Sequence, residues 1–184
     1  VFYPENFGRE GLFINIQAFF VNKFGHQPWA LRLPSAIFGI LTVLGLYFFT
    51  KELLNGNHEL GIKNDGNKKS IHNSLFLIQY SEAIALLSAF LLATSFWHIN
   101  FSRIGFRAIM APAFLVWALY LLLKAINKNK SQLSNVKCQL LSALAGLIYG
   151  LGFYSYIAYR ATPLLVLFLM FIYWRRESAE ARKQ

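Results

Sequence analysis

The chain has 184 residues, of which 56% are apolar, 17% are aromatic and only 14% are charged. A typical soluble domain has about 25% charged residues, so the composition excludes a cytosolic enzyme. The wealth of aromatic and aliphatic residues excludes intrinsic disorder. The single cysteine, Cys138, excludes an internal disulfide framework and any multi-cysteine metal site. The class that remains is a membrane protein with several spans.

The formal net charge is +10, a value that often indicates nucleic-acid binding. Here the lysines and arginines fall between apolar runs, which is where a membrane protein keeps its cytoplasmic charges. We therefore expect membrane lipids, and no nucleic acid, among the partners.

The amino-terminal part precedes the first long apolar run. The chain begins at Val1 without a signal peptide pattern, so we expect one transmembrane domain that is truncated at both ends. Residues 1–9 are expected to form an external loop. Residues 10–24 are too short to span, but Leu12, Ile16 and Phe19 follow a helical period. The pattern predicts an amphipathic helix that lies in the membrane interface.

Five long apolar runs follow the interfacial helix. About 20 residues of helix cross about 30 Å of hydrocarbon, at about 1.5 Å per residue. The last two runs are near the lower limit for a span. The fold class expected is an all-α, polytopic transmembrane bundle of about five spans plus one interfacial helix. The predicted spans are residues 29–50, 76–96, 104–123, 140–157 and 161–173.

The distribution of lysine and arginine predicts the orientation. Segments 51–75, 124–139 and 175–184 carry four each, twelve of the eighteen in the chain. If the spans alternate in direction, these segments share one side, which the positive-inside rule makes cytoplasmic. The remaining arginines and Lys23 then lie outside. We expect a multi-pass protein of a bacterial or archaeal plasma membrane, with its site facing outward.

Two external arginines are the first candidate site. Arg103 and Arg107 are four residues apart, so on one helix they share a face at the start of the third predicted span. Two guanidinium groups at a helix amino terminus suit a phosphate. The alternative is that both side chains snorkel to the interface beside Trp97. His98 alone is more typical of an interface residue than of a ligand.

An aromatic stripe is the second candidate. Tyr149, Phe153, Tyr156 and Arg160 fall at i, i+4, i+7 and i+11, one stripe of a continuous helix. Such a stripe is usually packing, but one that ends in an arginine can line a groove for a lipid-linked anion. The Gly146–Gly150 spacing on the same span favours close contact between helices.

Carboxylates are scarce on the predicted external side. Glu5 and Glu10 are the only two there, so an external general base would be one of them or would lie upstream of Val1. The chain has no Walker-type loop, no HExxH and no GxSxG. No cofactor is predicted with certainty, and a divalent metal, although possible, has no support in the sequence.

Three segments in this order resemble the GT-C membrane glycosyltransferases. They are similar above all to the dolichyl-phosphate-mannose–protein mannosyltransferases and the bacterial aminoarabinose transferases. The resemblance runs from about Phe7 to Tyr173. The segments that carry it are Pro28-Trp-Ala-Leu-Arg-Leu-Pro-Ser-Ala-Ile-Phe-Gly39, Asn100-Phe-Ser-Arg-Ile-Gly-Phe-Arg107 and Gly150-Leu-Gly-Phe-Tyr-Ser-Tyr-Ile-Ala-Tyr-Arg160.

The resemblance implies transfer of a sugar from a polyprenyl-phosphate donor to a hydroxyl of a protein or lipid acceptor, with inversion. It implies that the donor phosphate is bound by Arg103, Arg107 and Arg160. It places Arg9, Tyr154 and Tyr156 in the substrate groove, Arg9 standing where the family often has a lysine. The family's catalytic acidic pair lies before the point where this chain begins, so we expect these residues alone to be inactive.

Two other functions remain open at this stage. A transporter or flippase of lipid-linked sugars shares the spans and the basic sites, but it needs charges or broken helices near the membrane midplane, and the predicted span centres carry none. A purely structural membrane subunit leaves the clustered external arginines unexplained.

Overall fold

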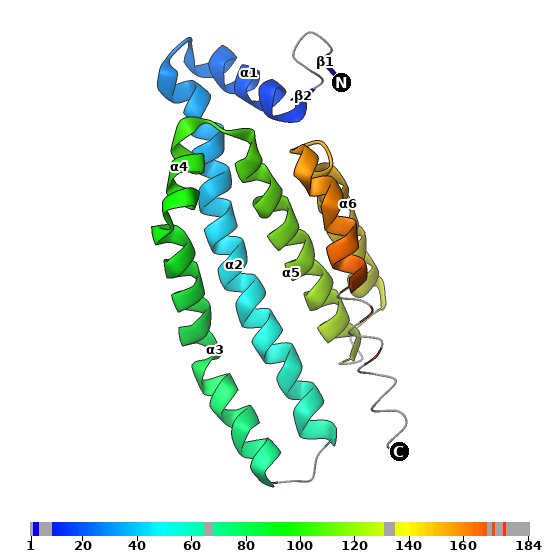
Figure 1. The fold of residues 1–184 in the computed structure, drawn as a ribbon. Coiled ribbons are helices and arrows are strands. Elements are labelled where there is room, and N and C mark those ends of the chain that lie inside the picture. Colours follow the sequence, from blue (N-terminus) through cyan, green and yellow to red (C-terminus); the bar gives the residue numbers. More distant parts are fainter. Residues whose placement is uncertain are drawn as a thin grey trace.

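The fold is a bundle of long helices (Figure 1). The computed structural model describes residues 2–3, 9–64, 68–130, 135–168, 171 and 175, with side chains for residues 11–54, 80–127, 136–168, 171 and 175. Apart from turns and two paired two-residue strands, the described chain is helical, as predicted. In chain order the elements are β1 (Phe2–Tyr3), β2 (Arg9–Glu10), α1 (Leu12–Phe24), α2 (Pro28–Asn64), α3 (Lys68–Thr94), α4 (Phe96–Ile104), the 3-10 helix η2 (Arg107–Ile109), α5 (Met110–Lys130), α6 (Asn135–Gly152) and the 3-10 helix η3 (Ile157–Ala161), which continues as helix to residue 168.

Helix α1 lies across the end of α2 instead of running alongside it (Figure 1). It ends at Gly25, whose φ of 83° suits a glycine, and Pro28 then opens α2, where a missing N–H costs nothing. Phe13 faces the protein and is buried, whereas Phe19 is 63% exposed. An apolar face turned away from the bundle agrees with the predicted interfacial helix.

Helix α2 is the centre of the bundle, since it contacts α1, α3, α4 and α5, and α5 in turn contacts α6. Two glycines in α2 allow α4 and α5 to approach it closely. A Cβ on Gly39 would lie 2.7 Å from Cβ of Ser102 in α4, and one on Gly45 would lie 2.6 Å from Cγ1 of Val116 in α5. The indole N–H of Trp117 also donates to the carbonyl oxygen of Leu41, at 3.0 Å, and so ties α5 to α2.

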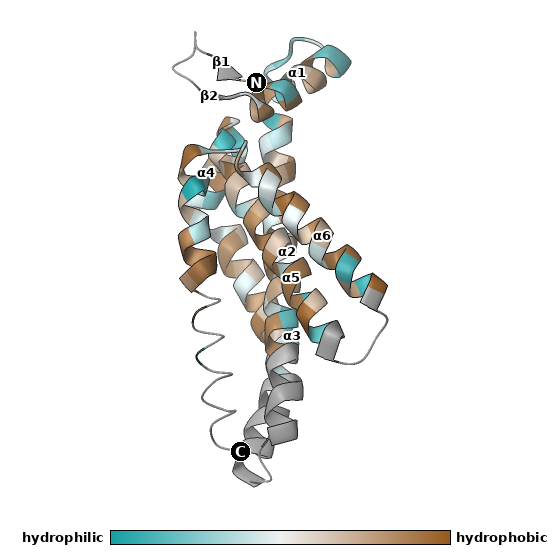
Figure 2. Ribbon diagram, turned by 90° about the vertical axis from the view of Figure 1, so that its right-hand side faces the viewer, coloured by the Kyte–Doolittle hydropathy of each residue, from teal (hydrophilic) through white to brown (hydrophobic). Residues whose placement is uncertain are grey.

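Among the described residues, two helical segments are long and apolar enough to cross a membrane, Pro28–Leu54 and Arg107–Asn127. A third is possible if Tyr80–Thr94 and Phe96–Ile104, which meet at an angle of 58°, count as one span. Apolar residues dominate α2 and α5, while α1 carries both kinds (Figure 2). The described helices therefore support a membrane protein, and the count of five spans stays a prediction.

The corner between α3 and α5 differs from the prediction. The predicted span 104–123 begins at Ile104, but Ile104 is the last residue of α4, and α5 begins only at Met110. Gly105 separates the two helices in the left-handed conformation, with φ 78° and ψ 33°, which is a common way to end a helix. The apolar run is continuous in sequence but is broken in structure.

The last two helices also lie earlier in the chain than the predicted spans. Helix α6 ends at Gly152, five residues before the end of the predicted span 140–157. A Cβ on Gly152 would clash with the ring of Tyr159, so the chain turns here and η3 packs back on α6. The predicted span 161–173 corresponds to a helix that the structure describes from Ile157 to Phe168. Among the described residues their apolar segments, Val136–Gly152 and Ile157–Phe168, each have fewer than 18 residues.

Candidate functional site

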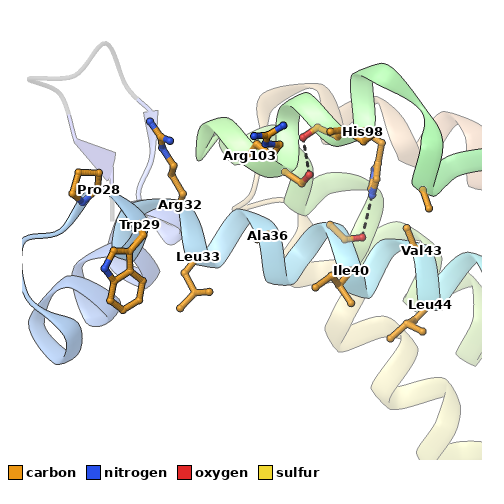
Figure 3. Close-up of a pocket in the computed structure, with 14 residues that line it drawn as sticks. Pro28, Trp29, Arg32, Leu33, Ala36, Ile40, Val43, Leu44, His98 and Arg103 are labelled. Carbon is orange, nitrogen blue, oxygen red and sulfur yellow. Dashed lines mark hydrogen bonds between the residues drawn. The ribbon is translucent and has the colours of Figure 1, made fainter.

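An open groove of about 890 Å³ runs between the first half of α2 and the corner where α3 meets α4 (Figure 3). At one end it is lined by Arg32 and Arg103, both exposed. Further along α2 its lining becomes apolar, with Ala36, Ile40 and Val43 at the spacing of one helical face. We call this feature the arginine groove.

The two guanidinium groups lie on the same side of α2 in Figure 3. In the described part of the chain the one ion pair is Lys51–Glu82, so neither Arg32 nor Arg103 is neutralised there. An arginine offers a planar fork of donors that matches phosphate oxygens. The open end of the groove therefore suits an anion, and its length suits an apolar chain.

Side-chain hydrogen bonds to backbone fix α4, and with it Arg103, on α2. The Ser35 hydroxyl lies 2.7 Å from the carbonyl oxygen of Arg32 and 2.9 Å from that of Ser102, so its proton is shared between the two helices. Nε2 of His98 lies 3.1 Å from the carbonyl oxygen of Gly39. Because a carbonyl only accepts, Nε2 carries the proton. His98 therefore holds α4 against α2 in the wall of the groove.

A second, smaller cavity of about 390 Å³ lies where α1 meets the turn between α4 and α5. We call it the corner cavity. Its polar lining consists of Gln17, Arg107 and Tyr156, and its apolar lining includes Phe13 and Phe106. The guanidinium carbon of Arg107 lies 5.6 Å from the ring centre of Tyr156, in a cation–π contact.

The structure separates the two arginines that the sequence pairs. Arg103 is in the last turn of α4 and lines the arginine groove, whereas Arg107 begins η2 and lines the corner cavity. The prediction that they share one face of one helix is wrong, because Gly105 reverses the backbone between them. Arg103 shares its groove with Arg32 instead.

The predicted aromatic stripe is also broken. Because α6 ends at Gly152, Tyr149 and Phe153 pack against Tyr159, with each ring centre 5.5 Å from that of Tyr159. The sequence predicts Tyr156 on the same helix face as Tyr149 and Phe153, but in the structure Tyr156 lines the corner cavity.

The other predicted members of this region lie apart from both cavities. Tyr154 is 61% exposed, Arg160 is exposed in η3, and neither lines the arginine groove or the corner cavity. The Gly146–Gly150 spacing does not provide a close helix contact within the described chain, since nothing lies within 4 Å of a Cβ built on either glycine. Gly39, Gly45 and Gly152 provide the close approaches instead.

The amino-terminal candidates are only partly described. Arg9 and Glu10 lie in β2, opposite Tyr3 and Phe2 of β1, and their side chains are outside the described residues, as is the whole of Glu5. The two described carboxylates, on Glu52 and Glu82, belong to the far half of the bundle, where they bind Asn127 and Lys51. No three potential metal ligands cluster among the described residues.

No protein-family model matches this chain, and no curated protein or solved structure shows significant similarity to it. The geometry of the two cavities therefore carries the functional argument.

Sequence reasoning missed two residues of these cavities. Arg32 was counted among the external arginines and in the segment that resembles the glycosyltransferases, but its pairing with Arg103 depends on a helix contact across 71 positions. Gln17 is a polar residue within the predicted interfacial helix to which the sequence assigned no role, and its side-chain amide donates to the carbonyl oxygen of Leu31 at 2.8 Å.

Proposed function

We propose that this chain is part of a membrane glycosyltransferase that takes its sugar from a polyprenyl-phosphate donor. The observation that carries the proposal is the arginine groove, with Arg32 and Arg103 at its open end and an apolar wall along α2. The donor has the matching chemistry, because its charged phosphate is joined to a long hydrocarbon chain. The groove opens at the side of a bundle whose helices are apolar enough for a membrane, so such a lipid can enter it laterally.

The reaction we propose is a displacement at the anomeric carbon. The hydroxyl oxygen of a protein or lipid acceptor forms a bond to this carbon, and the bond from the carbon to the phosphate oxygen breaks, with its electron pair leaving on the phosphate. A carboxylate removes the hydroxyl proton. Arg32 and Arg103 stabilise the charge that develops on the phosphate. Glu10 and Glu5 are the candidate bases within this chain.

The test uses the whole protein in lipid nanodiscs. It is mixed with polyprenyl-phosphate donors that carry different radiolabelled hexoses or pentoses, and with a lysate as acceptor. We expect label to move to protein or lipid with at least one donor, and to stop when Arg32 and Arg103 are both replaced by glutamine. Absence of transfer with every donor, together with absence of donor binding, contradicts the proposal.

A second candidate, transport of lipid-linked sugars, is favoured by one observation. The helix is broken at Ser95 with a bend of 58°, and broken helices are a feature of transporters. The same donors in proteoliposomes distinguish the two functions. Movement of intact donor across the bilayer without any transfer supports the transporter, and transfer without movement supports the enzyme.

We also propose that the end of the bundle with the arginine groove faces outward. The lysine- and arginine-rich segments 51–75 and 124–139 then face the cytoplasm. After Cys138 is replaced by serine, a cysteine at Asn100 should react with a membrane-impermeant maleimide in intact cells, and one at Asn67 should react only after lysis. The reverse pattern overturns this orientation.

A further inference from the structure

The corner cavity and the arginine groove are neighbours at the same turn of the chain. A Cβ on Gly105 would lie 3.7 Å from Nε2 of Gln17, which lines the corner cavity, and 3.8 Å from Cα of Arg32, which lines the groove. Arg103 and Arg107 stand two residues before and two residues after this glycine. The two spaces are therefore adjacent, with the backbone of one turn between them.

The two spaces differ in size and chemistry. The groove is long and largely apolar, whereas the corner cavity, at about 390 Å³, is near the lower end of the range for small-molecule sites. The amide of Gln17 uses one N–H on Leu31 and has a second N–H and a carbonyl oxygen to offer. Arg107 adds charged donors beside the rings of Tyr156 and Phe106.

This combination suits a sugar better than a second phosphate. A sugar ring presents apolar C–H faces to aromatic rings and hydroxyl groups to amide and guanidinium groups. A phosphate has no apolar face. Among the described residues that line the cavity Arg107 is the one cation, and it is stacked on Tyr156. The aromatic rings and the one amide in the wall of the cavity match a single sugar ring.

We propose that the corner cavity binds the sugar of the donor while the arginine groove binds its phosphate and the first part of its lipid chain. This inference rests on the proposed function. It makes Gln17, Arg107 and Tyr156 the residues that select the sugar, and Arg32 and Arg103 the residues that bind any polyprenyl phosphate.

The experiment measures the binding of two probes to the whole protein in nanodiscs. The first probe is bare polyprenyl monophosphate. The second is the same lipid phosphate with one hexose or pentose attached, and the sugar used is the one that binds most tightly in a panel of such donors. Arg107→Gln should weaken the sugar-bearing lipid about ten- to a hundredfold, and Tyr156→Phe about two- to tenfold, with little change for the bare phosphate. Lys137→Gln removes a positive charge and Tyr80→Phe removes a tyrosine hydroxyl at the far end of the bundle, and neither should change either affinity. Thermal unfolding verifies that each variant is folded.

The outcomes separate the inference from the function on which it rests. If neither lipid binds the unmodified protein, the proposed function fails. If both lipids bind but no sugar improves the affinity, or if Arg107→Gln and Tyr156→Phe weaken both probes equally or neither, the assignment of the corner cavity to the sugar is wrong and the phosphate site in the groove still stands.

Discussion

Replacing both Arg32 and Arg103 by glutamine should weaken the binding of polyprenyl monophosphate by about 10²- to 10⁴-fold. Each charge-assisted hydrogen bond to phosphate contributes roughly 1.5–3 kcal/mol, which is about ten- to a hundredfold in affinity, and the two losses combine. Both side chains are exposed at the open end of one groove, so their removal should leave the packing of α2 on α4 intact. Titration of the lipid into nanodisc-bound protein measures the effect.

Lysine at the same positions separates a phosphate site from interfacial snorkelling. Lysine keeps the charge but loses the planar fork, so Arg103→Lys should fall between the unmodified protein and Arg103→Gln. Snorkelling predicts that lysine serves as well as arginine and that glutamine lowers stability instead of affinity. Unchanged affinity in the double glutamine variant contradicts the phosphate site.

The same titration compares two pairings of arginines. The structure places Arg32 and Arg103 in one groove, and Arg107 in another cavity. A double-mutant cycle on bare polyprenyl monophosphate should therefore show coupling between Arg32 and Arg103 and near-additivity between Arg103 and Arg107. Strong coupling between Arg103 and Arg107 instead would favour the arrangement predicted from the sequence.

The elements that the sequence predicts well are those whose signal is local. The long apolar run at residues 29–50 became the core of α2, and the amphipathic period of residues 10–24 became α1. Length and period decide such elements, because each helix satisfies its own backbone hydrogen bonds. Arg107 and Tyr156, which the resemblance assigned to the phosphate site and to the substrate groove, line one cavity, and their roles in binding stay predictions.

The parts that the sequence did not predict depend on single backbone conformations. Glycine is common inside transmembrane helices, so nothing in the sequence marks Gly105 as a helix end. One residue with φ 78° nevertheless moves Arg107 from the face of Arg103 to a different cavity. Contacts between distant segments cannot be predicted from one sequence either. An example is the hydrogen bond from the Ser35 hydroxyl to the carbonyl oxygen of Ser102, 67 positions away.

Gly152 should be the glycine least tolerant of a methyl group. A Cβ there would clash with the ring of Tyr159, which is 1% exposed and packed between Tyr149 and Phe153. Overpacking costs about 1–3 kcal/mol, more than the 0.5–1 kcal/mol that alanine gains over glycine in a helix. We expect Gly152→Ala to lower the free energy of unfolding, measured by thermal or denaturant unfolding in detergent.

Gly146 provides the matched control on the same helix. Nothing lies within 4 Å of a Cβ at Gly146, so Gly146→Ala should be neutral or stabilise by up to about 1 kcal/mol. Because the clash is with one ring, Gly152→Ala combined with Tyr159→Leu should cost less than the sum of the two single changes. The N–H of Tyr159 donates to the carbonyl oxygen of Tyr156, which lines the corner cavity, so we expect Gly152→Ala to weaken binding of the sugar-bearing lipid more than binding of the bare phosphate. Equal stabilities of Gly146→Ala and Gly152→Ala would show that α6 does not turn at Gly152 in the way this packing requires.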